Sequence, residues 1–267
     1  MTECVTLITG ASSGIGSELA RIFAANGHRV ALVARRAERL TKLANDIETA
    51  SVNASRTTPV KPPIIIPCDL EKPEAVDVIV ETLKRENVEV DHVVNNAGFG
   101  LFGQATELDR GEQLGIIDVN IRAMTDLSLR FADQLIRHRG GILNVASIAG
   151  FLPGPGMAVY YASKAYVLSF TEALRQELAS RRVRVTALCP GPVPSEFQLR
   201  AGFEPGFDSL VLNVSAREVA RQGYRGLMAN KRIVIPGLGV RAVPVLLRMF
   251  PRGFILAAVG RLQLRRR

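Results

Sequence analysis

The sequence lacks the residues that would indicate a disulfide framework or a histidine-based metal site. Its 267 residues include no tryptophan and only three cysteines, Cys4, Cys68 and Cys189, which form no CxxC pair and have no regular spacing. This cysteine usage is typical of a protein in a reducing, intracellular environment. The three histidines are scattered along the chain, so we expect no metal centre built on them.

Long hydrophobic runs are also absent. No stretch of eighteen or more uncharged apolar residues occurs, so we expect no transmembrane helix. The chain starts with Met1-Thr2-Glu3 and continues at once into the apolar segment 5–9, which does not resemble a signal peptide. These features predict a cytoplasmic protein, with peripheral membrane contact left open by the charge distribution.

Acidic residues are missing from the C-terminal part of the chain. Residues 219–267 contain eleven Lys or Arg and no Asp or Glu, so the overall charge of +9 belongs to this segment. Residues 238–267 form a basic, apolar extension, in which Pro244 and Pro251 interrupt any long helix. The segment is either a helix lying on anionic lipid or docking an acidic carrier protein, or a packed helix or helix pair with a solvated basic tail. It lacks interleaved aromatic residues, so we expect no nucleic-acid binding.

Short apolar segments alternate with helix-length segments along the chain. Such a pattern predicts an α/β fold, in which a parallel sheet is covered by helices on both faces. A length of 267 residues is compatible with a single domain, residues 1–267. The candidate strands are 5–9, 29–34, 64–67, 92–95, 141–147, 183–189 and 233–236, and helical patterns cover 14–25, 114–136 and about 158–181.

A glycine-rich turn joins the first strand to the first helix. It contains Gly10, Ser12, Ser13, Gly14, Ile15 and Gly16. Glycine permits a tight turn and a close approach of phosphate oxygens, and the helix N-terminus offers free N–H groups to an anion. A plain strand-to-helix turn is the alternative. The strand–turn–helix context favours a dinucleotide pyrophosphate site.

Tyr160 and Lys164 are separated by one helical turn and can share one helix face. An ammonium near a phenol favours the phenolate, so we expect Lys164 to lower the pKa of Tyr160. Tyr161 has Ala165 at the equivalent position and is not expected to take this role. Ser147, thirteen residues upstream of Tyr160, ends a predicted strand, where its hydroxyl can hold a substrate oxygen. These three side chains point to proton transfer to a carbonyl oxygen.

The ordered motifs resemble those of the short-chain dehydrogenase/reductase family over residues 5–195. They are the glycine turn, Asp69, the Asn95-Asn96-Ala97-Gly98 segment, Asn120, Ser147, Tyr160-x-x-x-Lys164 and Pro190-Gly191. The resemblance implies a Rossmann-type, doubly wound parallel sheet of about seven strands and a nicotinamide-dependent oxidoreductase. It also implies that Asn120, in a helix irregularity, binds a water that relays protons to Lys164. The three-residue gap between Tyr160 and Lys164 favours carbonyl chemistry over enoyl reduction.

The same resemblance implies further cofactor contacts. Asp69 would lie near the adenine, whereas Asn95 and Gly98 would contact the adenosine ribose or support the central strand. The full set of further positions expected to bind cofactor is Asp69, Asn96, Ala97, Gly98, Pro190, Gly191, Val193 and Ser195, together with Tyr160 and Lys164.

Arginine replaces the usual acidic residue at the end of the second strand. A carboxylate there would hydrogen-bond the adenosine ribose of NAD, whereas Arg35 and Arg36 can bind a 2′-phosphate. Both could instead belong to the solvated start of the next helix. We expect NADP(H), with Arg35 as the first phosphate contact and Arg36 as the second.

The sequence therefore predicts an NADP-dependent carbonyl reductase or alcohol dehydrogenase. A non-catalytic NADP-binding sensor or scaffold is the alternative, although it would have no need of a proton relay. Residues 190–215 are expected to cover the substrate, and the apolar side chains in this segment suggest an apolar pocket: Phe197, Leu199, Phe203, Phe207 and Leu210. The resemblance also suggests a homodimer or homotetramer through the helices around 111–138 and 158–181.

Overall fold

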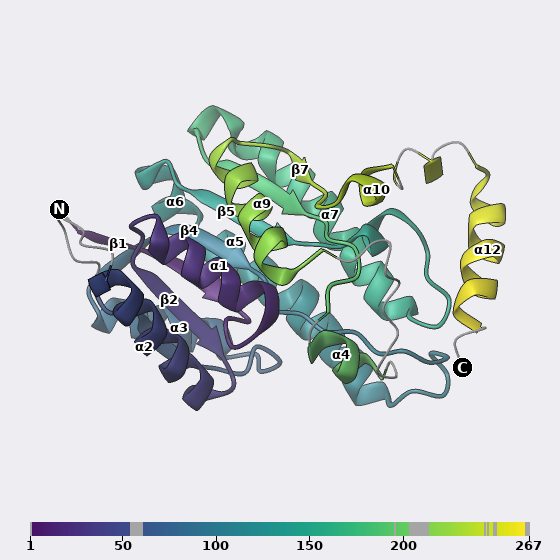
Figure 1. Ribbon diagram of the computed structural model, residues 1–267, viewed down its shortest axis with the longest axis horizontal. Helices are drawn as coiled ribbons and strands as arrows, with labels where there is room; N and C mark the ends of the chain where they lie inside the picture. Colours follow the sequence, from purple (N-terminus) through teal and green to yellow (C-terminus); the bar gives the residue numbers. More distant parts are fainter. Residues whose placement is uncertain are drawn as a thin grey trace.

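A seven-stranded parallel sheet forms the centre of the molecule (Figure 1). The computed structural model describes residues 2–53, 61–194, 196–202, 214–242, 244, 246–247 and 250–264. The strand order is β3-β2-β1-β4-β5-β6-β7, so the direction of winding reverses between β1 and β4. The strands are β1 (Glu3–Thr9), β2 (Val30–Ala34), β3 (Ile64–Pro67), β4 (Val88–Asn95), β5 (Gly141–Val145), β6 (Arg184–Leu188) and β7 (Ile233–Val234).

Helices cover both faces of this sheet. Helices α1 (Gly14–Ala25), α2 (Ala37–Asn53) and α9 (Ala216–Met228) pack on one face. The other face is covered by α3 (Ala75–Arg85), α4 (Arg110–Ile117), the π-helix η1 (Asp118–Ala123), α5 (Met124–Arg130), α6 (Ala132–His138) and α7 (Ala158–Leu178). The predicted fold class, a doubly wound parallel sheet with helices on both faces, is confirmed.

Adjacent residues of the central strands belong to opposite cores. Leu7 packs in the core beneath α3 and α5, whereas Ile8 packs beneath α1 and α9, and both are fully buried. The same alternation separates Ala31 from Leu32 in β2. Strands buried on both faces are apolar at nearly every position, which explains the near-continuous apolar runs in the sequence.

Strand positions in the structure agree with the predicted segments, and the main differences concern ends and helix continuity. Strand β4 starts at Val88 rather than at residue 92. The helical pattern over 114–136 is wrong as one continuous helix, because η1 and the turn at Phe131 divide it into separate pieces. A π-helix inserts an extra residue per turn, which periodicity in the sequence does not reveal.

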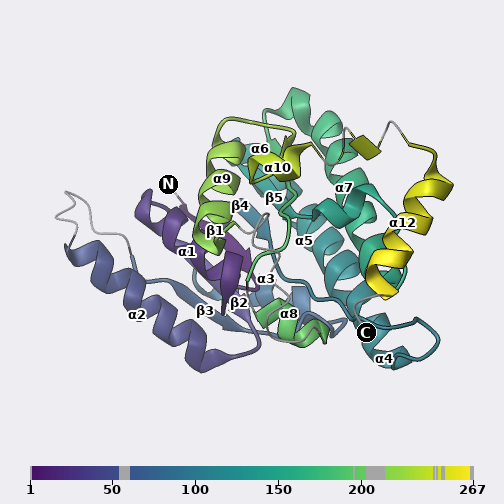
Figure 2. The ribbon, with the colours of Figure 1, turned by 45° about the vertical axis from the view of Figure 1, so that its right-hand side comes forward.

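Short elements link and follow this central body. They are the 3₁₀ helices η2 (Ile148–Phe151) and η3 (Ala179–Arg181), and the helices α8 (Glu196–Ala201), α10 (Leu238–Arg241) and α12 (Arg252–Leu264). Helix α12 lies at the far end of the molecule from β1 and α2, away from the sheet, as Figure 1 and Figure 2 both show. No helix within the described ranges combines the length and apolar character needed to span a bilayer.

Candidate active site

A cavity of about 700 Å³ opens at the carboxyl ends of the strands. This is the edge at which an open α/β sheet binds ligands, next to the reversal of strand order between β1 and β4. Its lining comes from the glycine turn, the ends of β2, β4 and β5, the start of α7, and α8. Helix α8 lies beside the ends of β1 and β2 in Figure 2. An ion pair joins Glu196 of α8 to Arg36, which follows β2.

The glycine turn has a conformation that only glycine adopts easily. Gly10 and Gly14 have φ angles of 65° and 55°, in the left-handed region. A Cβ atom on Gly10 would lie 2.7 Å from Nδ2 of Asn96, and one on Gly16 would collide with the Gly10 carbonyl. The Asn96 amide donates to the carbonyls of Thr9 (2.9 Å) and Gly10 (3.2 Å). Asn96 therefore fixes the turn that faces the cavity.

Ser147, Tyr160 and Lys164 meet at the inner wall of the cavity. Ser147 follows the end of β5 and caps η2, where its Oγ accepts a hydrogen bond from the Ala149 amide (3.1 Å). Its hydroxyl also interacts with the Tyr160 phenol. Lys164 is only 5% exposed, and its Nζ donates to the Val145 carbonyl (2.9 Å). The end of β5 thus positions both the serine and the lysine.

Asn120 lies behind this wall, in the π-helix η1. Its side chain is 1% exposed and makes three hydrogen bonds, to the amide (3.1 Å) and carbonyl (3.0 Å) of Phe99 and to the Ser163 hydroxyl (2.9 Å). A Cβ on Gly98 would lie 2.9 Å from Asn120 Oδ1 and 3.3 Å from Lys164 Nζ. Asn120 and Lys164 therefore border the same small space beside Gly98, in the predicted helix irregularity.

The expectation that Lys164 lowers the pKa of Tyr160 is wrong for this structure. Burial raises the pKa of Tyr160 above its usual range, although the Ser147 hydrogen bond opposes that change. Burial also lowers the pKa of Lys164 from 10.5 to about 8. The lysine Nζ lies 5.8 Å from the centre of the Tyr160 ring and points its hydrogen bond at Val145. Desolvation is the largest influence on the pKa of Tyr160, so the phenol is protonated at neutral pH.

Helix α8 is tied to the arginines that follow β2. Arg36 donates to Ser12 Oγ (3.1 Å) of the glycine turn and to Glu196 Oε2 (2.8 Å) at the start of α8. Arg39 forms a second ion pair with Glu196. Hydrogen bonds from Arg39 and Arg36 hold the pKa of Glu196 below its usual range, so this carboxyl is ionised at neutral pH. The Glu196 carboxylate thus binds the guanidinium of Arg36, which also donates to Ser12 of the glycine turn.

A second ion pair anchors the other end of α8. Arg200 Nη2 lies 3.3 Å from Glu71 Oε1, and Arg35 Nη1 lies 3.5 Å from the same oxygen. The Arg200 guanidinium also stacks over the Phe99 ring, 3.7 Å from its centre. Because Arg35, Arg36, Glu71 and Arg200 all line the cavity, α8 is held across its mouth by charges of both signs.

Comparison with known proteins assigns the fold to a family. A family profile described as short chain dehydrogenase matches residues 4–202, which include the residues that line the cavity. The chain belongs to the short-chain dehydrogenase family. Its predicted resemblance is thereby confirmed, as is the prediction that it is an oxidoreductase.

Curated relatives and solved structures of this family extend over most of the chain. A sulfoacetaldehyde reductase of Chromohalobacter salexigens is 36% identical over 232 residues, covering 84% of this chain and 87% of the relative. A short-chain dehydrogenase from Sphingobium yanoikuyae in complex with NADPH has 30% identity and a TM-score of 0.80, with 94% of each chain covered. A 3-ketoacyl-(acyl-carrier-protein) reductase from Brucella melitensis complexed with NADH has 27% identity and a TM-score of 0.74, covering 87% of this chain and 96% of that one.

The short-chain dehydrogenase fold brings almost all the predicted site residues to this one cavity. Gly16 is an exception, because it packs behind the turn, and Asn120 lies behind the wall. Ser195 lies outside the described residues. The lining includes all the other predicted positions: Gly10, Ser12, Ser13, Gly14, Ile15, Arg35, Arg36, Asp69, Asn96, Ala97, Gly98, Ser147, Tyr160, Lys164, Pro190, Gly191 and Val193.

The predicted covering segment, 190–215, is described only in part. Phe197 lines the cavity, and its ring centre lies 5.3 Å from that of Tyr160. Leu199 is 64% exposed and does not line the cavity, so its predicted place in an apolar pocket is wrong. Phe203, Phe207 and Leu210 lie outside the described residues. Helix α8 turns Leu199 away because residues two apart in a helix face different directions.

Sequence reasoning missed several residues of the site. Tyr161, which is not expected to take the role of Tyr160, nevertheless lines the same cavity, and its ring centre lies 6.0 Å from that of Tyr160. Gly100 was overlooked, although a Cβ there would lie 2.8 Å from Cδ2 of Tyr160. Glu196 was overlooked because its partners are about 160 residues away in the chain. The one available signal is that Gly100 lies two residues after the recognised motif that ends at Gly98.

Gly100 gives a prediction about the position of the catalytic ring. We expect Gly100→Ala to displace the Tyr160 ring and to lower kcat for carbonyl reduction by about tenfold or more, since small misplacements of reacting groups are costly. Steady-state kinetics with a carbonyl substrate and NADPH measure the effect. Gly253→Ala is the control, because no atom lies within 4 Å of a Cβ at that position. Unchanged kcat in Gly100→Ala would contradict the role of this contact.

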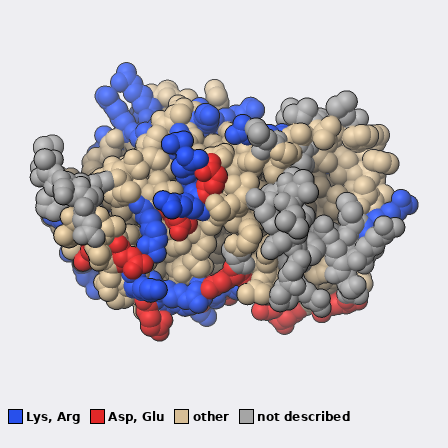
Figure 3. Space-filling model, viewed as in Figure 1, with Lys and Arg blue, Asp and Glu red and all other residues tan. Residues whose placement is uncertain are grey.

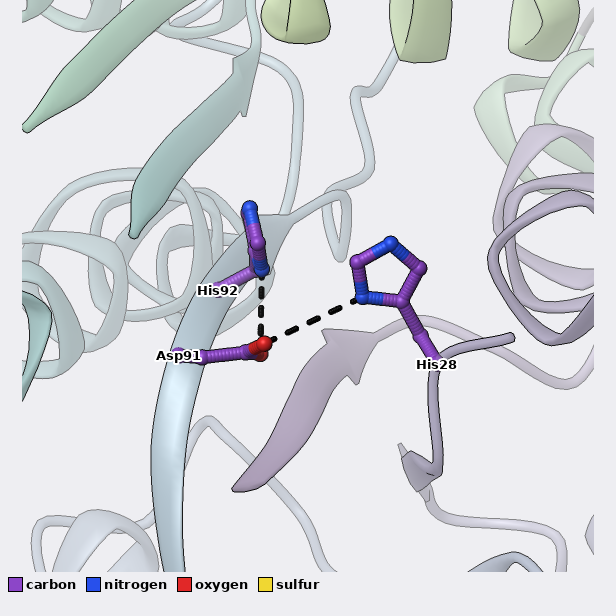
Figure 4. Close-up of side chains that lie close together, drawn as sticks. All are labelled: His28, Asp91 and His92. Atoms are coloured by element: carbon purple, nitrogen blue, oxygen red, sulfur yellow. Dashed lines mark ion pairs between the residues drawn. The ribbon is translucent and has the colours of Figure 1, made fainter. Parts of the chain in front are cut away.

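Three potential metal ligands meet at the opposite end of the sheet (Figure 4). Nδ1 of His28 and Nδ1 of His92 lie 3.9 Å and 3.0 Å from carboxylate oxygens of Asp91. Arg184 donates to Nε2 of His92 (3.0 Å), and a guanidinium can only donate. In neutral His92, Nδ1 must therefore carry the proton. A protonated Nδ1 has no lone pair to bind a metal ion. We interpret these residues as a polar network around Asp91.

Proposed function

We propose that this protein is an NADP-dependent oxidoreductase that interconverts an apolar ketone or aldehyde and the corresponding alcohol. The observation that carries the proposal is the convergence of Ser147, Tyr160 and Lys164 at one wall of a cavity that also contains the glycine turn. The relatives support it: one is named a sulfoacetaldehyde reductase and one structure is in complex with NADPH.

The residues around the cavity fit a dinucleotide. The absence of side chains at Gly10 and Gly14, and the N-terminus of α1 behind them, suit a pyrophosphate. Arg36 lies closer to the turn than Arg35 does, because it bonds Ser12 while Arg35 pairs with Glu71. We therefore reverse the order expected from the sequence and assign the main 2′-phosphate contact to Arg36, with Arg35 as the second contact. When bound, the reduced nicotinamide would supply a hydride to the carbonyl carbon.

The protein groups would manage the proton. Tyr160, protonated at neutral pH because burial raises its pKa, donates its hydroxyl proton to the carbonyl oxygen. Ser147 hydrogen-bonds the same oxygen and holds it beside the phenol. Lys164, whose ammonium borders Asn120 at Gly98, returns a proton to Tyr160, and Asn120 holds the relay in place. In the reverse direction the same groups would deprotonate an alcohol.

The side chains near Tyr160 suit an apolar substrate. Met157, Tyr161 and Phe197 line the cavity with Tyr160, and the Phe197 and Tyr160 rings are in contact distance. Burial of apolar substrate surface against these side chains would stabilise the complex. A homodimer or homotetramer through the α4–α5 and α7 helices, and a single domain over residues 1–267, remain parts of the proposal.

A panel of aliphatic and aromatic ketones and aldehydes tests the proposed activity. We expect carbonyl-dependent oxidation of NADPH, at a higher kcat/KM than with NADH and with apolar substrates preferred. Binding of NADPH without turnover of any carbonyl in the panel would instead favour the sensor alternative. Higher kcat/KM with NADH would contradict the assignment of Arg35 and Arg36.

Glu196 gives a sharper prediction about cofactor choice. Its carboxylate pairs with Arg36 and Arg39, so an incoming 2′-phosphate must compete with it for the same guanidinium groups. We expect Glu196→Gln to lower the Kd for NADPH by roughly threefold to tenfold and to leave the Kd for NADH unchanged. Isothermal titration with both nucleotides measures this difference.

A matched control is Glu48→Gln, which removes an exposed carboxylate from the same helix that carries Arg39. It should change neither Kd. Equal tightening of NADPH and NADH in Glu196→Gln would show that the 2′-phosphate does not reach these arginines.

A further inference from the structure

The C-terminal segment carries four exposed large apolar side chains, Leu246, Phe250, Phe254 and Leu256. They are 52%, 49%, 62% and 45% exposed, although large apolar residues are usually covered. The Phe250 and Phe254 rings stack with their centres 5.5 Å apart, so these two side chains form one exposed apolar surface at the start of α12. An exposed apolar surface of this kind marks an interaction site.

Helix α12 presents this surface outward. Ile255, Val259 and Gly260 are half-buried and face the rest of the protein, where a Cβ on Gly260 would lie 3.6 Å from Pro155. Phe254 is exposed on the outer side, next to the stacked Phe250 ring. The helix is thus held against the protein along one side and uncovered along the other.

Charge on this segment is of one sign. Arg252 and Arg261 stand near the two ends of α12 and are exposed, and residues 219–267 contain no acidic residue. Over the face formed by α1, α2 and α9, by contrast, Figure 3 shows basic and acidic side chains interspersed. Within residues 219–267, only basic side chains therefore accompany the apolar surface.

We propose that this surface docks on an anionic lipid bilayer, with α12 lying in the plane of the interface. Phe250 and Phe254 would enter the acyl boundary, while Arg252 and Arg261 would extend to lipid phosphates. Thirteen residues give a helix of about 20 Å, which suits lying on a membrane and is too short to cross one.

Other occupants fit this surface less well. A second copy of the chain would bring two uniformly basic segments together, and their charges would repel. An acidic protein would satisfy the arginines but would leave the adjacent aromatic side chains to be matched by a complementary apolar patch. A bilayer with anionic headgroups offers both the negative charge and the apolar layer in one surface.

The location links docking to the cavity. Pro155, which α12 contacts, lies in the turn between η2 and α7, two residues before Met157 of the cavity wall. A bilayer under α12 would therefore lie next to the site proposed for an apolar carbonyl compound. The docking itself does not depend on the proposed activity.

Vesicle co-sedimentation of the full chain tests the proposal. We expect wild-type protein to sediment with vesicles of phosphatidylcholine and phosphatidylglycerol, and far less with vesicles of phosphatidylcholine alone. The double variant Phe250→Ser/Phe254→Ser should lower the partition coefficient for anionic vesicles by about tenfold or more. Arg252→Gln/Arg261→Gln should also lower it and should weaken its salt dependence.

The control is Leu129→Ser, which removes an equally exposed apolar side chain (56%) from α5, outside the surface. It should leave vesicle binding unchanged. Because the chain has no tryptophan, Phe254→Trp provides a single reporter whose emission should shift to the blue on vesicle binding. Circular dichroism and the melting temperature check that each variant folds.

Three results would overturn the proposal. The first is that wild-type protein stays in the supernatant with anionic vesicles at low salt. The second is that Leu129→Ser loses as much vesicle binding as Phe250→Ser/Phe254→Ser. The third is that Phe250→Ser/Phe254→Ser retains vesicle binding but has a lower oligomeric mass by light scattering. The last result would assign the surface to contacts between copies of the chain.

Discussion

Tyr160→Phe is expected to lower kcat for carbonyl reduction by about 10³-fold or more while the Kd for NADPH stays within a factor of about two. The substitution removes only the hydroxyl that would donate the proton. The ring remains to fill the space against Gly100 and Phe197, so the shape of the cavity is kept. Steady-state kinetics and nucleotide titration of the same preparation measure the two quantities.

Tyr161→Phe is the matched control for this variant. Both tyrosines line the cavity, and their rings are neighbours, but it is the Tyr160 phenol to which we assign the proton, because it interacts with the Ser147 hydroxyl. We therefore expect Tyr161→Phe to keep kcat within about threefold of the wild-type value. Full activity in Tyr160→Phe, or an equal loss in both variants, would contradict the assignment of the proton donor.

Lys164→Met is expected to reduce activity and to stabilise the fold at the same time. The ammonium is 5% exposed, and burial lowers its pKa from 10.5 to about 8, so holding the charge below pH 8 costs roughly 3 kcal/mol. Loss of the hydrogen bond to the Val145 carbonyl offsets part of this gain. We expect the free energy of unfolding at pH 7 to rise by about 1–2 kcal/mol and kcat to fall by about 10²-fold or more.

The pH dependence gives the sign of this effect. The free-energy cost of the buried Lys164 ammonium is fully present in the wild type below pH 8, where the folded lysine is charged. This cost declines as pH rises from about 8 to 10.5. The stability advantage of Lys164→Met should therefore shrink over that range in urea unfolding experiments. Lys42→Met, at an exposed position of α2, is the control and should leave stability nearly unchanged. A destabilised Lys164→Met at pH 7 would show that the buried charge is compensated.

Local patterns predict the fold and most of the site because the chemistry is concentrated in short motifs at strand ends. Ser147 could be placed at the cavity because it follows β5, and Gly10 and Gly14 because only glycine suits their backbone angles. Continuous apolar strands likewise reveal a sheet buried on both faces. These features depend on residues close in sequence.

Features that depend on distant contacts do not follow from local patterns. The helix irregularity at Asn120 was implied only by the family resemblance, because its hydrogen bonds to Phe99 and Ser163 join separate parts of the chain. The ion pair of Glu196 with Arg36 joins segments about 160 residues apart and was not predicted. The direction of the shift in the Tyr160 pKa depends on burial of the phenol, which a sequence motif does not reveal. Each of these features depends on tertiary packing.

The pH profile of kcat/KM for carbonyl reduction by the wild-type protein tests most directly that a protonated Tyr160, supplied by Lys164, gives its proton to the substrate. Burial keeps the pKa of the phenol high, whereas that of the lysine is about 8. We predict constant kcat/KM at neutral pH and a decline above about pH 8, as Lys164 loses its proton. A profile that rises with pH, or that stays level up to the ordinary lysine pKa of 10.5, would contradict this proton path.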